Sequence, residues 1–97
     1  TDKSGSKRRP ALVISTPHFN NHHDHVVLAM ITTARQSDWP SDIPLEEWDA
    51  AGLSTACRVR LKVFTLDRDL ILKRIGMLAD RDRQAVRHAL SRNLAVA

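Results

Sequence analysis

The chain has 97 residues and a formal net charge of +4, from 15 Lys and Arg against 11 Asp and Glu. This length predicts one domain with one modest core and no cofactor, and the basic balance favours an anionic partner such as nucleic acid or an acidic peptide. A single cysteine, Cys57, excludes an internal disulfide and a zinc site built on several thiolates, and fits a reducing, cytoplasmic compartment. No apolar run approaches the roughly 18–20 residues that span a bilayer, and no signal peptide or membrane role is expected.

The first half of the chain predicts two buried strands separated by a polar loop. Residues 1–9 are rich in Ser, Gly, Lys and Arg, which is typical of a mobile loop that delivers cations. Residues 11–15 form a short apolar run with β-branched content, which predicts a buried strand. After a polar loop over residues 18–24, residues 26–31 predict a second buried strand. It runs directly into two hydroxyl side chains, those of Thr32 and Thr33.

The middle of the chain is polar and interrupted by proline. Residues 34–44 contain two prolines, so Ile43 and Leu45 belong to a short edge strand or to an extended loop. Residues 46–51 are compatible with a helical turn, and Gly52 is a residue type that ends such a turn in the left-handed conformation.

Residues 58–63 alternate cationic and apolar side chains, the sharpest periodic signal in the sequence. A strand here places Arg58, Arg60 and Lys62 on one face. Two interpretations remain open, a cationic face that tracks a phosphate backbone and an ordinary solvated strand face.

The last third predicts a helix. Residues 70–78 fit a further strand or a helical turn equally well. Residues 80–94 repeat apolar side chains at helical spacing, with arginines between them and Asp80 and Asp82 in the first turn. Short strands followed by one amphipathic helix predict a mainly β fold with a C-terminal α-helix packed on a small, strongly curved sheet.

Five stretches, in order along the chain, resemble landmarks of the PemK/MazF toxin family. They are the Gly/Ser loop with Arg9-Pro10 and an apolar strand (residues 4–15), Phe19-Asn20-Asn21, Ile31-Thr32-Thr33, Trp48 with Ala51-Gly52-Leu53, and Thr65-Leu66-Asp67 followed by Ile75-Gly76-Met77-Leu78. The resemblance covers nearly the whole chain. It implies a small SH3-like, partly open barrel of the type shared by the CcdB and PemK toxins, a homodimer, an acidic antitoxin as partner, and cleavage of single-stranded RNA at short sequences.

The same resemblance implies a catalytic pair. The family's Arg of Arg-Pro and its strand-end Thr correspond to Arg9 and Thr32. RNA is cut without a metal because its own 2′-OH is the nucleophile, which leaves a 2′,3′-cyclic phosphate and a 5′-OH. Arg9 would stabilise charge on the phosphate, and Thr32 would hold the phosphate or the 2′-OH. The predicted RNA contacts are Thr33, Arg60, Lys62, Asn20 and Arg8.

Two departures from the family pattern stand out. Relatives carry an N-terminal strand before the signature loop, whereas this sequence, expected to form one domain over residues 1–97, begins inside that loop. Some relatives also carry an acidic residue that assists cleavage at the position of Lys62.

The histidines at positions 18, 22, 23 and 25 permit two interpretations. In a loop they share no helical spacing, which argues against a metal site, whereas one of them acting as general base suits their ordinary pKa. Two other functions are compatible with the same fold. A gyrase poison is one, although the chain lacks that group's C-terminal Trp-Gly-Ile, and a catalytically inactive domain that binds a partner is the other.

Overall fold

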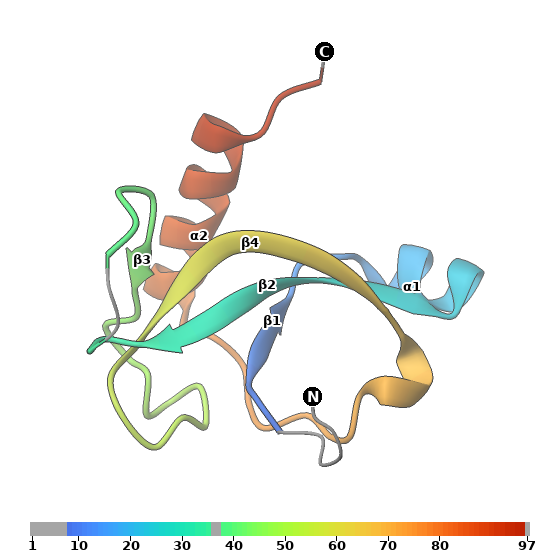
Figure 1. The fold of residues 1–97 in the computed structure, drawn as a ribbon, viewed down its shortest axis with the longest axis horizontal. Helices are drawn as coiled ribbons and strands as arrows, with labels where there is room; N and C mark the ends of the chain where they lie inside the picture. The colour runs from blue at the N-terminus through green and yellow to red at the C-terminus, as the bar shows by residue number, and fades with distance from the viewer. Residues whose placement is uncertain (1–7, 36–37, 97) are drawn as a thin grey trace.

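The computed structural model describes residues 8–35 and 38–96, which form a four-stranded antiparallel sheet with one long helix against it (Figure 1). The strand order is β1-β2-β4-β3. The elements are β1 (Ala11–Val13), α1 (Pro17–His23), β2 (His25–Thr33), β3 (Ile43–Pro44), β4 (Cys57–Asp67), a short 3-10 turn (Arg68–Leu70) and α2 (Asp80–Asn93). The predicted mainly β fold with a C-terminal helix is confirmed.

The two long strands, β2 and β4, give the sheet its strong curvature (Figure 1). Their register shifts once: Ala29 pairs with Val63, but the next residue, Met30, pairs with Arg60. Strand β4 therefore carries two extra residues at this point, and such a bulge bends a strand and increases its twist. The sheet consequently curls into a half-barrel, and the predicted strand over residues 58–63 is part of a longer strand than the alternation indicated.

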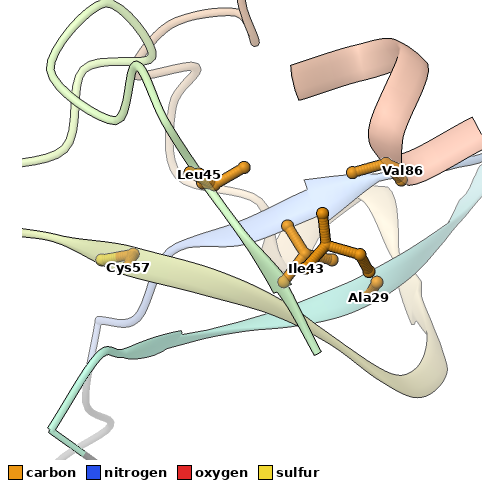
Figure 2. Packing of buried hydrophobic residues seen from close by; sticks show 6 residues of the cluster. Ala29, Ile43, Leu45, Cys57 and Val86 are labelled. Carbon is orange, nitrogen blue, oxygen red and sulfur yellow. The ribbon is translucent and has the colours of Figure 1, made fainter. Parts of the chain in front are cut away.

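The core lies between the sheet and α2. Its buried members are Ala29, Ile43, Leu45, Cys57, Val59 and Val86, and Figure 2 shows Val86 of α2 facing the sheet residues. Apolar residues at helical spacing on α2 supply this contact, as the sequence indicated. Burial also raises the pKa of the Cys57 thiol, since a low-polarity environment disfavours the thiolate.

A buried carboxylate joins α2 to the turn that follows β3. Asp82 is 1% exposed, and its two oxygens accept hydrogen bonds of 2.9 Å each from the backbone N–H groups of Glu46 and Glu47. The sequence indicated only that Asp82 suits a helix N-terminus. In the structure it also fixes the position of α2 relative to the sheet.

The predicted loop over residues 18–24 is wrong for most of its length, because residues 17–23 form α1. The Thr16 side chain caps this helix by accepting a hydrogen bond from the Phe19 N–H at 3.2 Å, and Pro17 occupies the first turn. Asp24 ends the helix in the left-handed conformation at φ 54°.

Residues 70–78 were compatible with a strand or a helical turn, but only Leu70 belongs to a regular element, the 3-10 turn, and residues 71–79 form neither strand nor helix. This segment packs closely on the turn before β4. A Cβ added to Gly76 would collide with the carbonyl of Ala51. Gly52 ends the turn in the left-handed conformation at φ 86°, as its residue type predicted. Among the residues described, no helix is long and apolar enough to cross a membrane.

Candidate functional site

The two residues expected to form the catalytic pair lie at the same end of the β1–β2 strand pair. Ala11 is paired with Met30; Arg9 lies two residues before Ala11, and Thr32 lies two residues after Met30. Arg9 is exposed in the segment that leads into β1, whereas Thr32 is 8% exposed. An exposed cation thus precedes one strand at the end where the neighbouring strand presents a hydroxyl.

Strand alternation determines which side chains share a face with Thr32. Thr32 pairs with Arg58 and Met30 pairs with Arg60, so these four side chains lie on one face of the sheet. Thr33 pairs instead with Cys57, a member of the core. The Thr33 side chain therefore lies on the opposite, core side and does not share the face that carries Thr32.

A buried carboxylate, that of Asp42, organises the cations on this face. Oδ1 of Asp42 accepts from Nε of Arg60 at 3.0 Å, and Oδ2 accepts from Nη2 at 2.8 Å. The two side chains are 5% and 7% exposed, respectively. This two-pronged arrangement is the strongest geometry of an Arg–carboxylate pair. Because the Arg60 side chain is only 7% exposed, little of its guanidinium is open to an RNA phosphate.

Asp42 also holds Arg58, whose Nε lies 3.3 Å from Oδ2. The Arg58 guanidinium further donates from Nη2 to the Ala34 carbonyl at 2.8 Å and pairs with the exposed carboxylate of Asp38. The hydrogen bond from Arg60 is the main cause that holds the pKa of Asp42 below its ordinary value of 3.8, against the opposing effect of burial. The same hydrogen bond raises the pKa of Arg60.

An indole ring lies near two cations of this face, Arg60 and Lys62. The ring of Trp39 lies 5.1 Å from the guanidinium carbon of Arg60 and 5.4 Å from Nζ of Lys62, within the range of cation–π attraction. Lys62 itself is exposed, as is Arg8, which precedes Arg9. Both cations are therefore open to solvent in the region of the predicted RNA contacts.

Asn20, another predicted RNA contact, lies far from Thr32. It belongs to α1, and its side-chain oxygen is hydrogen-bonded to Ser15, whose hydroxyl also accepts from the N–H of Val27. Val27 and Thr32 are five residues apart on β2, about 17 Å at a rise of ~3.3 Å per residue. The structure does not bring Asn20 to the phosphate that Thr32 would contact.

The histidines share this distant end of β2. His18 and His22 are four residues apart on α1, and their rings stack with centroids 5.6 Å apart. They do have helical spacing, contrary to the prediction of a loop. In the described part of the chain, however, no group of three or more His, Cys, Asp or Glu side chains is placed to hold a metal ion. A general base from this cluster would have to act at the far end of the strand from Thr32.

Sequence reasoning missed Asp42 and gave Trp39 no functional role. The alternation of residues 58–63 revealed the cations but not the carboxylate that binds them, which lies 18 residues before Arg60. One signal was available: a Trp-Pro-Ser-Asp stretch favours a tight turn that returns the Asp to the Trp backbone. In the structure, Asp42 accepts from the Trp39 N–H at 3.1 Å and its own N–H donates to the Trp39 carbonyl at 2.9 Å.

Solved structures of known proteins share this fold. An endoribonuclease in complex with its cognate antitoxin from a mycobacterial species is 22% identical, with a TM-score of 0.76 over 98% of this chain and 88% of the other. The toxin MazF-mt6 of Mycobacterium tuberculosis is 22% identical, with a TM-score of 0.73 over 87% of this chain and 83% of its own. A MazE–MazF structure from Deinococcus radiodurans is 23% identical, with a TM-score of 0.72 over 93% and 84%.

These structural matches support the half-barrel fold that the resemblance implied. No curated protein sequence matches the chain. The family model of PemK-like, MazF-like toxins matches residues 1–94, which is nearly the whole sequence. The chain therefore belongs to the PemK-like, MazF-like toxins of type II toxin–antitoxin systems.

Proposed function

We propose that this protein is an endoribonuclease toxin that cleaves single-stranded RNA at specific sequences, using the RNA 2′-OH and no metal ion. Its family membership supports this function, as does a solved relative that is an endoribonuclease. The observation that carries the proposal is the location of Arg9 and Thr32. Both lie two residues beyond the Ala11–Met30 pair, at the same end of two neighbouring strands.

The chemistry divides between the two side chains. Arg9 has a permanently charged planar fork, which stabilises the negative charge that develops on the phosphoryl oxygens as the 2′-OH attacks. The Thr32 hydroxyl orients the 2′-OH or the phosphate by hydrogen bonding. Because free Arg is a poor proton donor, electrostatic stabilisation is its main contribution. The products are a 2′,3′-cyclic phosphate and a 5′-OH.

The remaining cations fit an RNA path across this end of the sheet. Lys62 and Arg8 are exposed and would contact phosphates, whereas Arg60 would act indirectly by fixing Asp42 and the turn that carries Trp39. Contacts of Lys62 and Arg8 with phosphate release counterions, so RNA affinity would fall as the salt concentration rises.

An acidic antitoxin and a second copy of the chain complete the proposal. Two of the solved structures contain an antitoxin or MazE with the toxin, and an acidic segment suits the basic surface of this chain. A homodimer is supported by large apolar side chains left exposed after β4. Leu70, Leu72 and Met77 are each at least 60% exposed, and pairing would bury such surface.

The test is cleavage of single-stranded RNA in excess EDTA, followed by analysis of the new ends. Wild-type protein is expected to give cyclic-phosphate ends, and Arg9→Ala or Thr32→Val to slow cleavage by about 100-fold or more. Arg87→Ala is the matched control, since it removes an exposed arginine from α2 and is expected to cleave at the wild-type rate. Cleavage abolished by EDTA would refute metal independence, and no cleavage under any condition would favour a binding function.

A further inference from the structure

Trp39 has a surface that the proposed reaction does not use. Although it is one of the largest apolar side chains in the protein, it is 37% exposed. Its backbone is fixed, because both hydrogen bonds between Trp39 and Asp42 close the turn, and Asp42 is anchored to Arg60. An exposed indole on a fixed turn is suited to binding a flat partner with little loss of backbone conformational entropy.

The position of this ring relates it to the proposed catalytic end of β2. The ring lies over Arg60 and Lys62, and Arg60 pairs with Met30, two residues from Thr32. Two residues of a strand span about 7 Å. Arg60 and Thr32 share one face of the sheet, and the ring lies over Arg60. The ring is therefore on the same face as the Thr32 side chain.

The second tryptophan shows what a packing role looks like in this fold. Trp48 is half-buried, packs against the core cluster and accepts a hydrogen bond from the Leu53 N–H through its carbonyl at 3.1 Å. Trp39 does not belong to that cluster, and its ring lies near two cations of β4, Arg60 and Lys62. The structure therefore gives the two tryptophans different environments.

We infer that Trp39 stacks on an RNA base next to the phosphate held by Thr32, an inference that rests on the proposed nuclease function. Every base has a π-face, so such a contact is tolerant of sequence and adds affinity that does not depend on salt. Lys62, held beside the ring, is placed to neutralise the phosphate that joins the stacked nucleotide to its neighbour. Trp39 would thus hold the RNA chain in position without selecting a base, and other groups would recognise the sequence.

The test compares Trp39→Leu, which keeps apolar bulk but lacks a π-face, with Trp39→Phe, which keeps one. The ligand is a pool of 2′-O-methyl RNA of about ten nucleotides, which cannot be cleaved because the nucleophile is blocked. The leucine variant is expected to bind about 5- to 150-fold more weakly than wild type. The phenylalanine variant should bind close to wild type.

Two controls separate stacking from a structural role. The leucine variant and wild type should bind an abasic backbone of equal length with the same affinity, since that ligand has no base to stack. The slope of log affinity against log salt concentration should be unchanged in the leucine variant. Lys62→Gln removes one phosphate contact, so it should make this negative slope shallower by about 0.7. In a Trp48→Phe background, RNA binding should also quench the fluorescence of Trp39.

The inference is overturned if the two Trp39 variants bind alike, or if the leucine defect persists on the abasic backbone. In either case, wild-type cleavage in EDTA would leave the proposed nuclease function standing. A wild-type protein that neither binds nor cleaves RNA would refute both. Urea unfolding of each variant, followed by far-ultraviolet circular dichroism, establishes that the compared proteins are folded.

Discussion

Asp42→Asn tests how the cationic face is held together. The carboxylate of Asp42 accepts two hydrogen bonds from Arg60 and lies 3.3 Å from Nε of Arg58. Asparagine has nearly the same shape, but it carries no charge and has one acceptor in place of two. The variant therefore leaves the buried guanidinium of Arg60 only partly satisfied.

The structure sets the size of the effect. Breaking a buried ion pair costs about 3–5 kcal/mol, and the acceptor that Asn retains recovers part of this, so we expect a loss of about 2–4 kcal/mol in the free energy of unfolding. Asp38→Asn is the matched control, because Asp38 pairs with Arg58 from a side chain that is 80% exposed. Such surface pairs contribute about 0–1 kcal/mol.

The effect has a defined pH dependence. The pKa of Asp42 in the folded protein lies below its ordinary value of 3.8, so the folded state binds this proton less tightly than the unfolded state. The stabilisation is therefore complete above the unfolded pKa and is lost as the pH falls through the lower folded pKa. The difference in unfolding free energy between wild type and Asp42→Asn should be constant from neutral pH to about pH 5, and should narrow below the unfolded pKa of 3.8.

The assay is urea unfolding at pH 7 and at several acid pH values, for wild type and both variants. An Asp42→Asn protein no less stable than Asp38→Asn at pH 7 would refute the buried ion pair. A difference that grows as the pH falls would refute the direction of the pKa shift.

Three further predictions concern the framework of the fold. Asp82→Ala removes the buried carboxylate that accepts from the backbone N–H groups of Glu46 and Glu47, and should destabilise the protein by about 2–5 kcal/mol in urea unfolding; a loss below about 0.5 kcal/mol would contradict this role. Gly76→Ala places a methyl group against the Ala51 carbonyl and should lower the melting temperature, whereas an unchanged value would show that the two turns are not packed closely. The thiol of Cys57 is buried with a raised pKa, so Ellman's reagent should modify it only as fast as the protein opens, and rapid modification of native protein at pH 7 would disagree with its burial.

Local patterns in the sequence were sufficient for most of the fold. Residues 11–15 and 26–31 are compact apolar runs, and residues 80–94 repeat at helical spacing, so the two strands and α2 could be predicted from periodicity. Helix α1 was missed because its seven residues lack such a pattern, although Thr16-Pro17 is a helix-start signal. The bulge in β4 depends on pairing with β2, and no local pattern specifies it.

The candidate site divides in a similar way. Arg9 and Thr32 were named through the family resemblance, because each lies within a short motif. The carboxylate of Asp42 could not be predicted, since its partner Arg60 is 18 residues away and the two meet only when β3 pairs with β4. The separation of Asn20 from Thr32 likewise depends on the direction and length of β2, a property of the folded sheet.

The central claim is that Arg9 and Thr32 act on one scissile phosphate. A double-mutant cycle measures this directly, through single-turnover RNA cleavage by Arg9→Ala, by Thr32→Val and by the protein with both changes. Two groups that serve the same phosphate should be strongly non-additive, so the double variant should cleave about as slowly as the slower single variant. A double variant whose defect equals the product of the two single defects would show that the residues act independently, and would contradict the account.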